Sequence, residues 1–275
     1  CIIIASINND TKEVKLVSVY RDTLLNTEEE TDDKANSAYA VGGAEAAVNM
    51  LNRNLDLDIQ DYVSVNFLAV ADVVDLLGGI DLDLTDEEVV HMNNYCVETS
   101  EITGKKYKKI EPEVAGTYHL NGVQAVSYSR IRYTEGGDFQ RTSRQRLVIE
   151  KIAEKAKKAD LSTINKLIDA VFPEITTSFT SGEIVKMSAG LLQYSIGDNE
   201  GFPMDNETPD SIPGYQGSYV VPKGLEENVI KLHKFLFPDE DYTPTDTVKE
   251  ISDHIKDVTG IYPDDSEDST EDNEE

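Results

Sequence analysis

The chain opens with two apolar runs whose spacing predicts a β-hairpin. Residues 2–7 and 14–20 are rich in Ile, Val and Leu, and the Asn and Asp residues at 8–10 are typical of the turn between two strands. In residues 80–84, Ile and Leu alternate strictly with Asp, which is the pattern of a strand with one buried face. Shorter apolar runs predict further strands at 62–66 and 219–221.

Helical spacing of apolar residues marks seven other segments. The segment 67–77 is followed by Gly78-Gly79, a common signal for the C-terminus of a helix. Because strands alternate with helices along the chain, the pattern predicts a layered α/β fold. The predicted helices are 43–55, 67–77, 121–129, 140–158, 161–171, 182–194 and 224–236.

Polar segments separate these elements and predict the loops. The chain has no internal repeat and no break in composition, which predicts a single domain over residues 1–237. Residues 238–263 then form a C-terminal extension. Residues 264–275 carry eight acidic side chains and no basic or aromatic residue, so they predict a disordered tail. Loops are predicted at 26–33, 100–117, 134–137 and 197–217.

The apolar runs are too short to cross a membrane, which takes about 18–20 consecutive apolar residues. The chain starts inside an apolar run, Cys1-Ile2-Ile3-Ile4, which is typical of the middle of a strand and not of a signal peptide. We therefore expect the natural protein to continue upstream of Cys1.

The charge balance excludes one class of partner. The chain has 53 acidic and 25 basic residues and a formal net charge of −28. Non-specific nucleic-acid binding needs a basic surface, so we expect no nucleic-acid partner. Such a body also repels anionic ligands unless its basic residues are concentrated at one place.

The arginines are concentrated in this way. Five of the seven arginines fall within residues 130–146, whereas lysine is scattered over the whole chain. Arginine suits bidentate binding of phosphate or carboxylate, so the cluster indicates either an anion site or a set of surface salt bridges. The five are Arg130, Arg132, Arg141, Arg144 and Arg146.

The common catalytic and metal motifs are absent. There is no Walker loop, G-x-S-x-G, G-x-G-x-x-G or H-E-x-x-H, and the two cysteines, Cys1 and Cys96, fit a disulfide or two thiols equally well. We expect surface or structural roles for the four histidines, His91, His119, His233 and His254.

Three short segments place polar residues next to predicted elements. Ser18–Thr23 puts Arg21 and Asp22 at the end of a strand, where open α/β sheets bind ligands, although a salt bridge in a turn explains the pair as well. Lys34–Tyr39 precedes Gly42-Gly43, and a glycine pair before a helix lets backbone amides face an anion. Val74–Gly79 carries Asp75 at a predicted helix end.

The fourth segment is the most informative. Arg130 and Arg132 alternate, so both point to one face if the segment is extended. Arg141, Arg144 and Gln145 share a helical face. Arginines in the first turn of a helix oppose the helix dipole, and a bound dianion would offset that cost. Arg146 points elsewhere and is predicted to lie at the surface. The segment therefore predicts a diphosphate site.

Together the four segments resemble the LytR-CpsA-Psr proteins of bacterial cell envelopes. The ordered motifs are R-D-T, K-x-N-x-A-Y with G-G, V-D-x-L-G-G, and R-x-R followed by D-x-x-R-x-x-R-Q, all within residues 1–150. The resemblance implies a three-layer α-β-α sandwich with a mixed central sheet and a hydrophobic pocket for a polyprenyl chain. It also implies an extracytoplasmic enzyme held at the membrane by one N-terminal helix.

The implied reaction transfers a phosphate-linked glycopolymer, such as a teichoic acid or a capsular polysaccharide, from a polyprenyl-pyrophosphate carrier to peptidoglycan. The resemblance assigns Arg21, Asp22, Asp138 and Arg141 to catalysis, with Asp22 orienting Arg21 and with Asp138 either orienting the arginines or acting as base. Supporting positions are Lys34, Asn36 and Asp75. The pyrophosphate ligands are Arg21, Arg130, Arg132, Arg141, Arg144 and Gln145.

The resemblance also implies Mg²⁺ as the cofactor. This sequence departs from the family pattern at three points. Tyr20 stands where the family commonly has Pro, and Tyr133 stands where it often has His. The magnesium-binding aspartates of the family lie upstream of Cys1, so we expect the chain to bind metal poorly.

Two other functions fit the same residues: a binding module for an anionic polymer, and a pyrophosphatase that cleaves the carrier with water. A polyprenyl ligand would need an apolar cavity. The apolar stripe that could line it, or could be plain core, is Leu161, Ile164, Leu167 and Ile168.

Overall fold

The structure is a computed structural model that describes residues 1–28, 31–190 and 193–264. By internal contacts the chain forms two compact units, each built from separate stretches of sequence. The first unit contains residues 1–18 and 60–201, and the second contains residues 19–59 and those from 202 onward.

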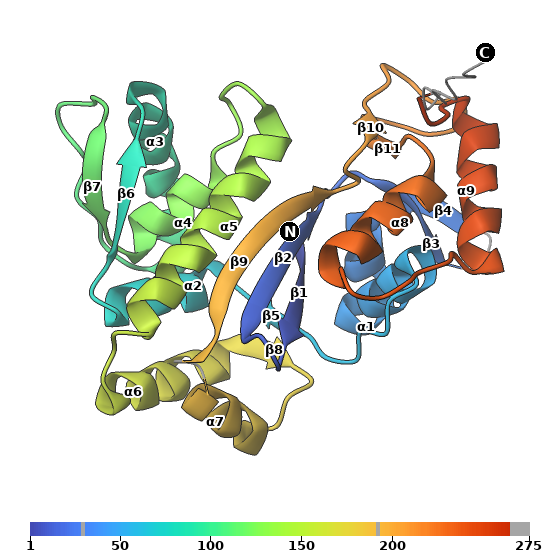
Figure 1. Cartoon of the computed structure of the whole chain (residues 1–275). Helices are drawn as coiled ribbons and strands as arrows, with labels where there is room; N and C mark the ends of the chain where they lie inside the picture. The colour runs from blue at the N-terminus through green and yellow to red at the C-terminus, as the bar shows by residue number, and fades with distance from the viewer. Residues whose placement is uncertain (29–30, 191–192, 265–275) are drawn as a thin grey trace, which may run out of the picture. The chain divides into compact units, whose positions relative to one another are not determined.

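The first unit begins with the predicted hairpin. β1 (Ile2–Asn8) and β2 (Glu13–Val19) form a sheet with β9 (Ser195–Phe202), and the order is β1-β2-β9 (Figure 1). The side chain of Asn8 closes the turn, because its Oδ1 accepts hydrogen bonds from the backbone N–H groups of Asp10 and Thr11 at 2.9 and 3.0 Å. The residues at 8–10 thus do what their turn preference predicts.

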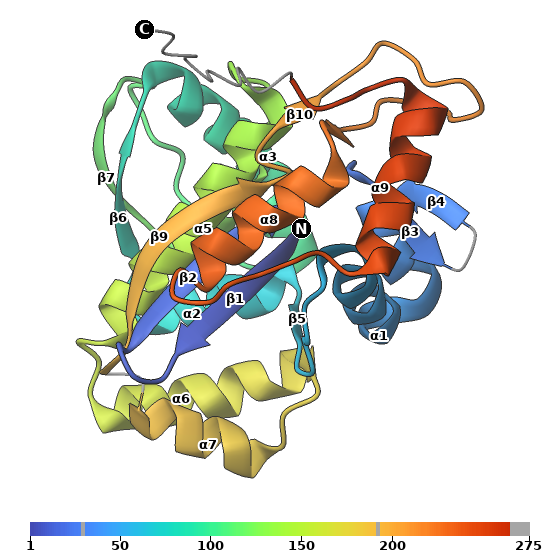
Figure 2. The same ribbon diagram turned by 45° about the vertical axis from the view of Figure 1, so that its right-hand side comes forward.

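A second layer of the first unit is built around a short antiparallel pair. β6 (Ile80–Leu84) pairs with β7 (Gly116–Leu120), and the apolar residues of β6 are buried while Asp81 and Asp83 are exposed. α2 (Phe67–Leu76), α3 (Asp86–Thr103), α4 (Gly122–Arg130) and α5 (Gly137–Ala156) complete this core (Figure 2). Its buried members include Val74, Leu82, Met92, Leu120, Tyr128, Ile131 and Val148.

Side chains at the helix starts fix α3 and α4. Thr85 and Asn121 each cap their helix through a reciprocal pair of bonds, with Glu88 and Gln124 three residues on. Gly122 is required at the start of α4, because a Cβ there would overlap the backbone of Ala71 in α2. These local signals decide where the helices carrying the arginines begin and how closely they pack.

The remaining elements of the first unit lie at residues 63–190. β5 (Val63–Val65) pairs antiparallel with β8 (Ile175–Thr177), and α6 (Leu161–Val171) packs against α2. A 3₁₀ turn, Phe172–Glu174, joins α6 to β8, and α7 (Ser181–Gly190) follows. No residue of α6 is buried, although the helix is strongly amphipathic.

The second unit packs helices on a short hairpin. β3 (Leu24–Glu28) pairs antiparallel with β4 (Thr31–Lys34), and α1 (Ala35–Leu55) and α9 (Asp246–Thr259) pack against β3. α8 (Leu225–Leu236) packs against α9, and β10 (Asn206–Glu207) pairs with β11 (Val221–Pro222). The fully buried side chains of this unit include Leu24, Leu25, Met50, Leu55, Leu225, Leu232 and Ile255.

Most predicted elements are confirmed within a few residues. β1, β2, β6, α2, α4, α5, α6 and α8 lie where the hydrophobic pattern places them, and the α/β class is confirmed. The predicted helix 182–194 is α7, and residues 191–192 of that prediction lie outside the described residues. The predicted disordered tail likewise lies outside them, apart from residue 264. The domain limits stay a prediction.

Several predicted loops are wrong. Within the described part of 26–33 the chain forms parts of β3 and β4, and within 197–217 it forms most of β9 and all of β10. The end of α3 and the start of β7 lie inside the predicted loop 100–117. The extension 238–263, for which no element was predicted, contains α9. The strands carry many polar residues and α3 is only weakly amphipathic, so neither shows a clear hydrophobic period.

The glycine pair Gly42-Gly43 divides α1 into two helical parts. Gly43, with φ 68° and ψ −156°, is non-helical and forms a kink between them, so the second part starts after the glycine pair, close to the predicted start of the helix 43–55. The prediction that the amides at this helix start face an anion stays a prediction. No described helix combines the length and the apolar character needed to cross a membrane.

Candidate functional site

Six predicted site residues of the first unit lie along α4, the loop after it and α5. Arg130 is the last residue of α4, Arg132 lies in the loop, and Asp138 lies in the first turn of α5. Arg141, Arg144 and Gln145 follow on α5. The expected extended segment around Arg130 is not present, because Arg130 is helical and Ile131 ends the helix as a fully buried residue.

Asp138 lies between two arginines. Arg141 donates from Nη2 to Oδ2 of Asp138 at 3.0 Å, and its Nη1 lies 2.9 Å from Oδ1. On the other side, Nε of Arg132 lies 3.4 Å from Oδ1 of the same carboxylate. The prediction of arginines in the first helical turn is wrong, because α5 begins at Gly137 and its first turn carries the acidic Asp138, which is favourable for the helix dipole.

Arg141 is buried, and part of its hydrogen-bonding capacity is unused. Its side chain is 6% exposed, and its Nε has no hydrogen-bond partner among the described residues. Arg132 is more open, with 41% of its side chain exposed. A buried donor without a partner costs free energy, so the site is suited to an acceptor such as a phosphate oxygen.

Gln145 follows Arg141 by one helical turn and shows the same feature. Its Nε2 donates to the carbonyl oxygen of Ser129 at 3.3 Å, which ties α5 to α4. Its Oε1 is buried and accepts no hydrogen bond from the described residues. Arg141 and Gln145 therefore bring one unused donor and one unused acceptor to successive turns of α5.

Arg130 and Arg144 are held by other carboxylates. Arg130 donates to Glu98 at 2.7 Å and to Thr99 at 2.9 Å, and its guanidinium lies over the rings of Phe67 and Tyr95. Arg144 donates from Nε to Glu88 at 2.9 Å. Of the two alternatives for the arginine cluster, the salt bridges are present, although not all of them lie at the surface, and the anion site stays a prediction.

The prediction that Arg146 lies at the surface is wrong. It is 7% exposed, and its Nε donates to Oδ1 of Asn199 in β9 at 2.6 Å. Its Nη2 also donates to the hydroxyl of Ser143 at 3.2 Å. Arg146 therefore joins two elements of the first unit.

Asp75 also connects elements. Its Oδ1 accepts a hydrogen bond from the N–H of Gly122 at 2.7 Å, and its Oδ2 pairs with Lys105 at 2.7 Å. Lys105 bonds Asp72 as well, and these partners raise the pKa of Lys105 although burial opposes the charged form. Asp75 thus joins the end of α2 to the start of α4, the helix that carries Arg130.

The second unit holds Arg21, Asp22, Lys34 and Asn36. Arg21 bonds Asp22 through Nε and Nη2, the shortest distance being 2.7 Å, and Lys34 lies 3.2 Å from the same carboxylate. Burial alone raises the pKa of Asp22, but the hydrogen bonds and charges of Arg21 and Lys34 outweigh burial and lower it. The backbone N–H of Asn36 donates to the carbonyl of Arg21 at 3.2 Å.

Tyr219 completes this cluster and was not predicted from the sequence. Nζ of Lys34 lies 4.8 Å from the centre of its ring, and its hydroxyl donates to Asp33 at 3.0 Å. Burial and the carboxylate of Asp33 raise the pKa of Tyr219 to about 12, so the hydroxyl remains a donor at neutral pH. Tyr219 is 185 residues from Lys34 in sequence, and no local signal indicates this contact.

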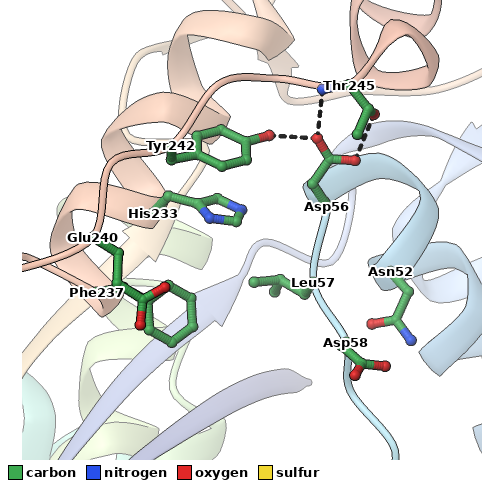
Figure 3. Close-up of a pocket in the computed structure, with 9 residues that line it drawn as sticks. All are labelled: Asn52, Asp56, Leu57, Asp58, His233, Phe237, Glu240, Tyr242 and Thr245. Atoms are coloured by element: carbon green, nitrogen blue, oxygen red, sulfur yellow. Dashed lines mark hydrogen bonds between the residues drawn. The ribbon is translucent and has the colours of Figure 1, made fainter.

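A pocket of about 550 Å³ in the second unit contains none of the predicted residues. Figure 3 shows the carboxylate of Asp56 bonded to the hydroxyl of Tyr242 and to the side chain and N–H of Thr245. The ring of His233 stacks on Tyr242, with centres 3.5 Å apart, and its Nε2 lies 2.8 Å from the carbonyl of Leu55. These contacts make Asp56 and His233 structural.

The described residues contain no group of three or more His, Cys, Asp or Glu side chains placed to hold a metal ion. Asp22 and Asp138, the two carboxylates nearest the predicted chemistry, are each engaged with basic side chains. Mg²⁺ therefore stays a prediction. Cys1 is exposed, Cys96 is buried, and no disulfide joins them.

The profile of the LytR_cpsA_psr family matches residues 1–218 of this chain. The chain belongs to the LytR-CpsA-Psr family. The match spans Arg21 and the arginine cluster at 130–146, and it ends one residue before Tyr219.

Curated relatives of this LytR-CpsA-Psr chain carry names from wall synthesis and regulation. Biofilm regulatory protein A of Streptococcus mutans is 34% identical over 204 residues, which cover 70% of this chain and 47% of the relative. The teichoic acid transferase TagU of Enterococcus faecalis is 32% identical, covering 68% and 56%. TagV of Bacillus subtilis is 28% identical, covering 88% and 60%. The chain spans about half the length of the first two relatives.

Solved structures show the same fold. A protein described as a transcriptional regulator from Enterococcus faecalis has a TM-score of 0.71 at 24% identity, covering 96% of this chain and 91% of its own. TagT bound to LI-WTA has a TM-score of 0.66 at 21% identity, covering 86% and 83%. At these identities the likeness concerns the fold.

Proposed function

We propose that this LytR-CpsA-Psr chain transfers a phosphate-linked glycopolymer, of the teichoic acid or capsular polysaccharide kind, from a polyprenyl-pyrophosphate carrier to peptidoglycan. The observation that carries the proposal is the Arg132–Asp138–Arg141 arrangement, with the unused Nε of Arg141 buried beside it. The names of TagU and TagV, teichoic acid transferases acting on peptidoglycan, support the substrate class.

In the proposed reaction, a hydroxyl oxygen of the peptidoglycan acceptor attacks the phosphorus that carries the glycopolymer. The bond from this phosphorus to the bridging oxygen breaks, and the polyprenyl phosphate leaves with that oxygen. Arg132 and Arg141 stabilise the charge on the transferring phosphate and on the leaving group. The acceptor proton passes to a carboxylate or to the leaving phosphate.

Asp138 could orient the arginines or act as base, and the geometry supports the orienting role. Both of its oxygens face Arg141, and one also faces Arg132, so the carboxylate fixes two guanidinium groups at once. The predicted contribution of Arg21, Asp22 and Lys34 to the same pyrophosphate site stays a prediction. So do the supporting roles of Asn36 and Asp75.

The lipid part of the substrate is supported by apolar surface in the first unit. None of the residues between 157 and 190 whose burial is described is fully buried, and Ile164, Leu167 and Ile168 of the stripe along α6 are half-buried. Leu161 is 76% exposed, and Val63 and Val65 in β5 are 53% and 52% exposed. A polyprenyl chain would cover apolar surface of this kind. Membrane anchoring and an extracytoplasmic location are part of the proposal.

The test is a transfer assay on the full-length protein. It uses a saccharide linked to polyprenyl pyrophosphate, Mg²⁺ and peptidoglycan oligomers, and mass spectrometry detects a phosphodiester between saccharide and peptidoglycan. Arg141→Ala should reduce the product at least about 100-fold, because a buried charge at the transferring phosphate is lost. Lys151→Ala, on the same helix and paired only with Glu154 by the described ion pairs, is the matched control and should leave the product unchanged.

Each other outcome contradicts the proposal in a distinct way. Free saccharide phosphate without acceptor product would assign the pyrophosphatase reaction. Tight binding of the carrier without turnover would assign the binding module. Equal transfer from a carrier that lacks the polyprenyl chain would exclude the lipid role of α6.

A further inference from the structure

Arg144 differs from the other arginines of α5 because each of its three nitrogens has a protein partner. Nε donates to Glu88 at 2.9 Å, Nη1 to the carbonyl of Ile131 at 3.4 Å, and Nη2 to the hydroxyl of Thr134 at 2.8 Å. The side chain is 7% exposed, and its guanidinium lies 5.9 Å from the ring centre of Tyr128. These contacts leave little room for a phosphate.

Two of these contacts fall on either side of Arg132. Ile131 precedes Arg132, and Thr134 follows it by two residues, so Arg144 holds the loop before and after the exposed arginine. Ile131 itself is fully buried, which fixes the start of the loop. The direction of Arg132 toward Asp138 therefore depends on Arg144.

Glu88 fixes Arg144 in turn. One carboxylate oxygen, Oε1, accepts from Arg144, and the other, Oε2, accepts from the backbone N–H of Thr85 at 3.0 Å as part of the capping box of α3. The Glu88 side chain is only 14% exposed. A buried carboxylate with both oxygens bonded holds its partner in one orientation.

We propose that Glu88 and Arg144 are positioning residues that hold the 131–134 loop so that Arg132 faces the pyrophosphate. The inference rests on the proposed function and corrects one part of the sequence-based assignment, which made Arg144 a direct pyrophosphate ligand. Because Glu88 neutralises the charge of Arg144, the pair contributes geometry to the site and little net charge.

Electrostatics and positioning predict opposite results for Glu88→Gln. Removing a negative charge near an anion site should tighten anion binding if charge alone matters. If Glu88 positions the loop, binding should weaken, because Arg144 loses its charged partner and the loop loosens. The change is mild for folding, since a glutamine oxygen still accepts the capping bond from Thr85.

The experiment measures binding of methylenediphosphonate to the full-length protein by calorimetry. We expect Glu88→Gln to weaken binding about 5-fold, and Glu87→Gln, in the same helical turn and 59% exposed, to leave it within about twofold. In an Arg132→Ala background, the Glu88→Gln effect should shrink below about twofold, because the pair acts through Arg132. Tighter binding by Glu88→Gln, or an undiminished effect in that background, overturns the proposal.

Thr134→Val provides a second variant that changes no charge. It removes the bond to Nη2 of Arg144 and should weaken methylenediphosphonate binding about 3-fold in the wild-type background only. An unchanged affinity would contradict the proposal that Arg144 holds the 131–134 loop. Failure of the wild-type protein to bind the diphosphonate would instead contradict the proposed function, so the two failures are distinguishable.

Discussion

The two clusters of basic residues in this protein are built in different ways. In the first unit the arginines are mostly buried, and Arg144 finds its carboxylate partner, Glu88, 56 residues away on another helix. In the second unit Arg21 pairs with its sequence neighbour Asp22 and is 33% exposed. Contacts between distant elements fix Arg144 of the first cluster, whereas the Arg21–Asp22 pair of the second cluster joins neighbours in sequence.

The difference has a consequence for binding. Rigid, buried donors lose little entropy when they bind an anion, and they act in a medium of low dielectric. An exposed arginine is screened by solvent and must give up motion on binding. Arg141 of the first cluster should therefore bind a diphosphate more strongly than Arg21 of the second, and the comparison of Arg21→Ala with Arg141→Ala tests this ranking.

The largest effect is expected at Asp138, which holds two arginines of the first cluster. Asp138→Asn should reduce transfer about 100-fold, because Arg132 and Arg141 lose their common carboxylate. Binding of methylenediphosphonate should tighten about 3-fold at the same time, since one negative charge leaves the site. Transfer and binding are measured separately by mass spectrometry and calorimetry.

Glu154→Gln is the control for this variant, because it removes an equally negative charge from the same helix at a position 49% exposed. It should change neither quantity by more than about twofold. Unchanged transfer by Asp138→Asn would show that the carboxylate does not orient the arginines.

A smaller effect is expected from Arg21 in the second cluster. Arg21→Ala should weaken diphosphonate binding about 10-fold, less than Arg141→Ala in the same assay, because Arg21 is the more exposed of the two. Arg53→Ala is the control in this unit, since Arg53 bonds Asn26 and has no predicted role in the site. A loss equal to that of Arg141→Ala would remove the distinction between the clusters.

The smallest effect concerns stability and pH. The pKa of Asp22 is lowered below 3.8 in the folded protein, because Arg21 and Lys34 outweigh the effect of burial. Its stabilising contribution is therefore present above pH ~3.8 and is lost as the pH falls through the lower folded value. Asp22→Asn should remove this part of the pH dependence and change the free energy of unfolding by less than about 1 kcal/mol at pH 7.

Urea unfolding between pH 3 and pH 7 measures this contribution. The wild-type protein should lose more stability on acidification than Asp22→Asn does. Parallel pH profiles for the two proteins would show that the contacts of Asp22 with Arg21 and Lys34 add no net stability.

Local sequence signals predicted part of the site and missed another part. The spacing of Arg141, Arg144 and Gln145 placed them on one helix, which α5 confirms. The same spacing could not distinguish a ligand-facing arginine from one held by Glu88 and Thr134, because those partners come from other elements. Thr85-x-x-Glu88 was a visible capping signal for α3, and following it would have found the helix that supplies Glu88.

The sequence by itself determined the α/β class, the positions of most helices along the chain and the concentration of arginine in an acidic chain, because these depend on hydrophobic period and composition. Only the tertiary structure decided which arginines are buried and which carboxylate each one meets. It also decided that polar segments such as β9 form strands. Ion pairs and strand pairing join residues far apart in sequence, so their energies depend on packing and burial that no local pattern contains.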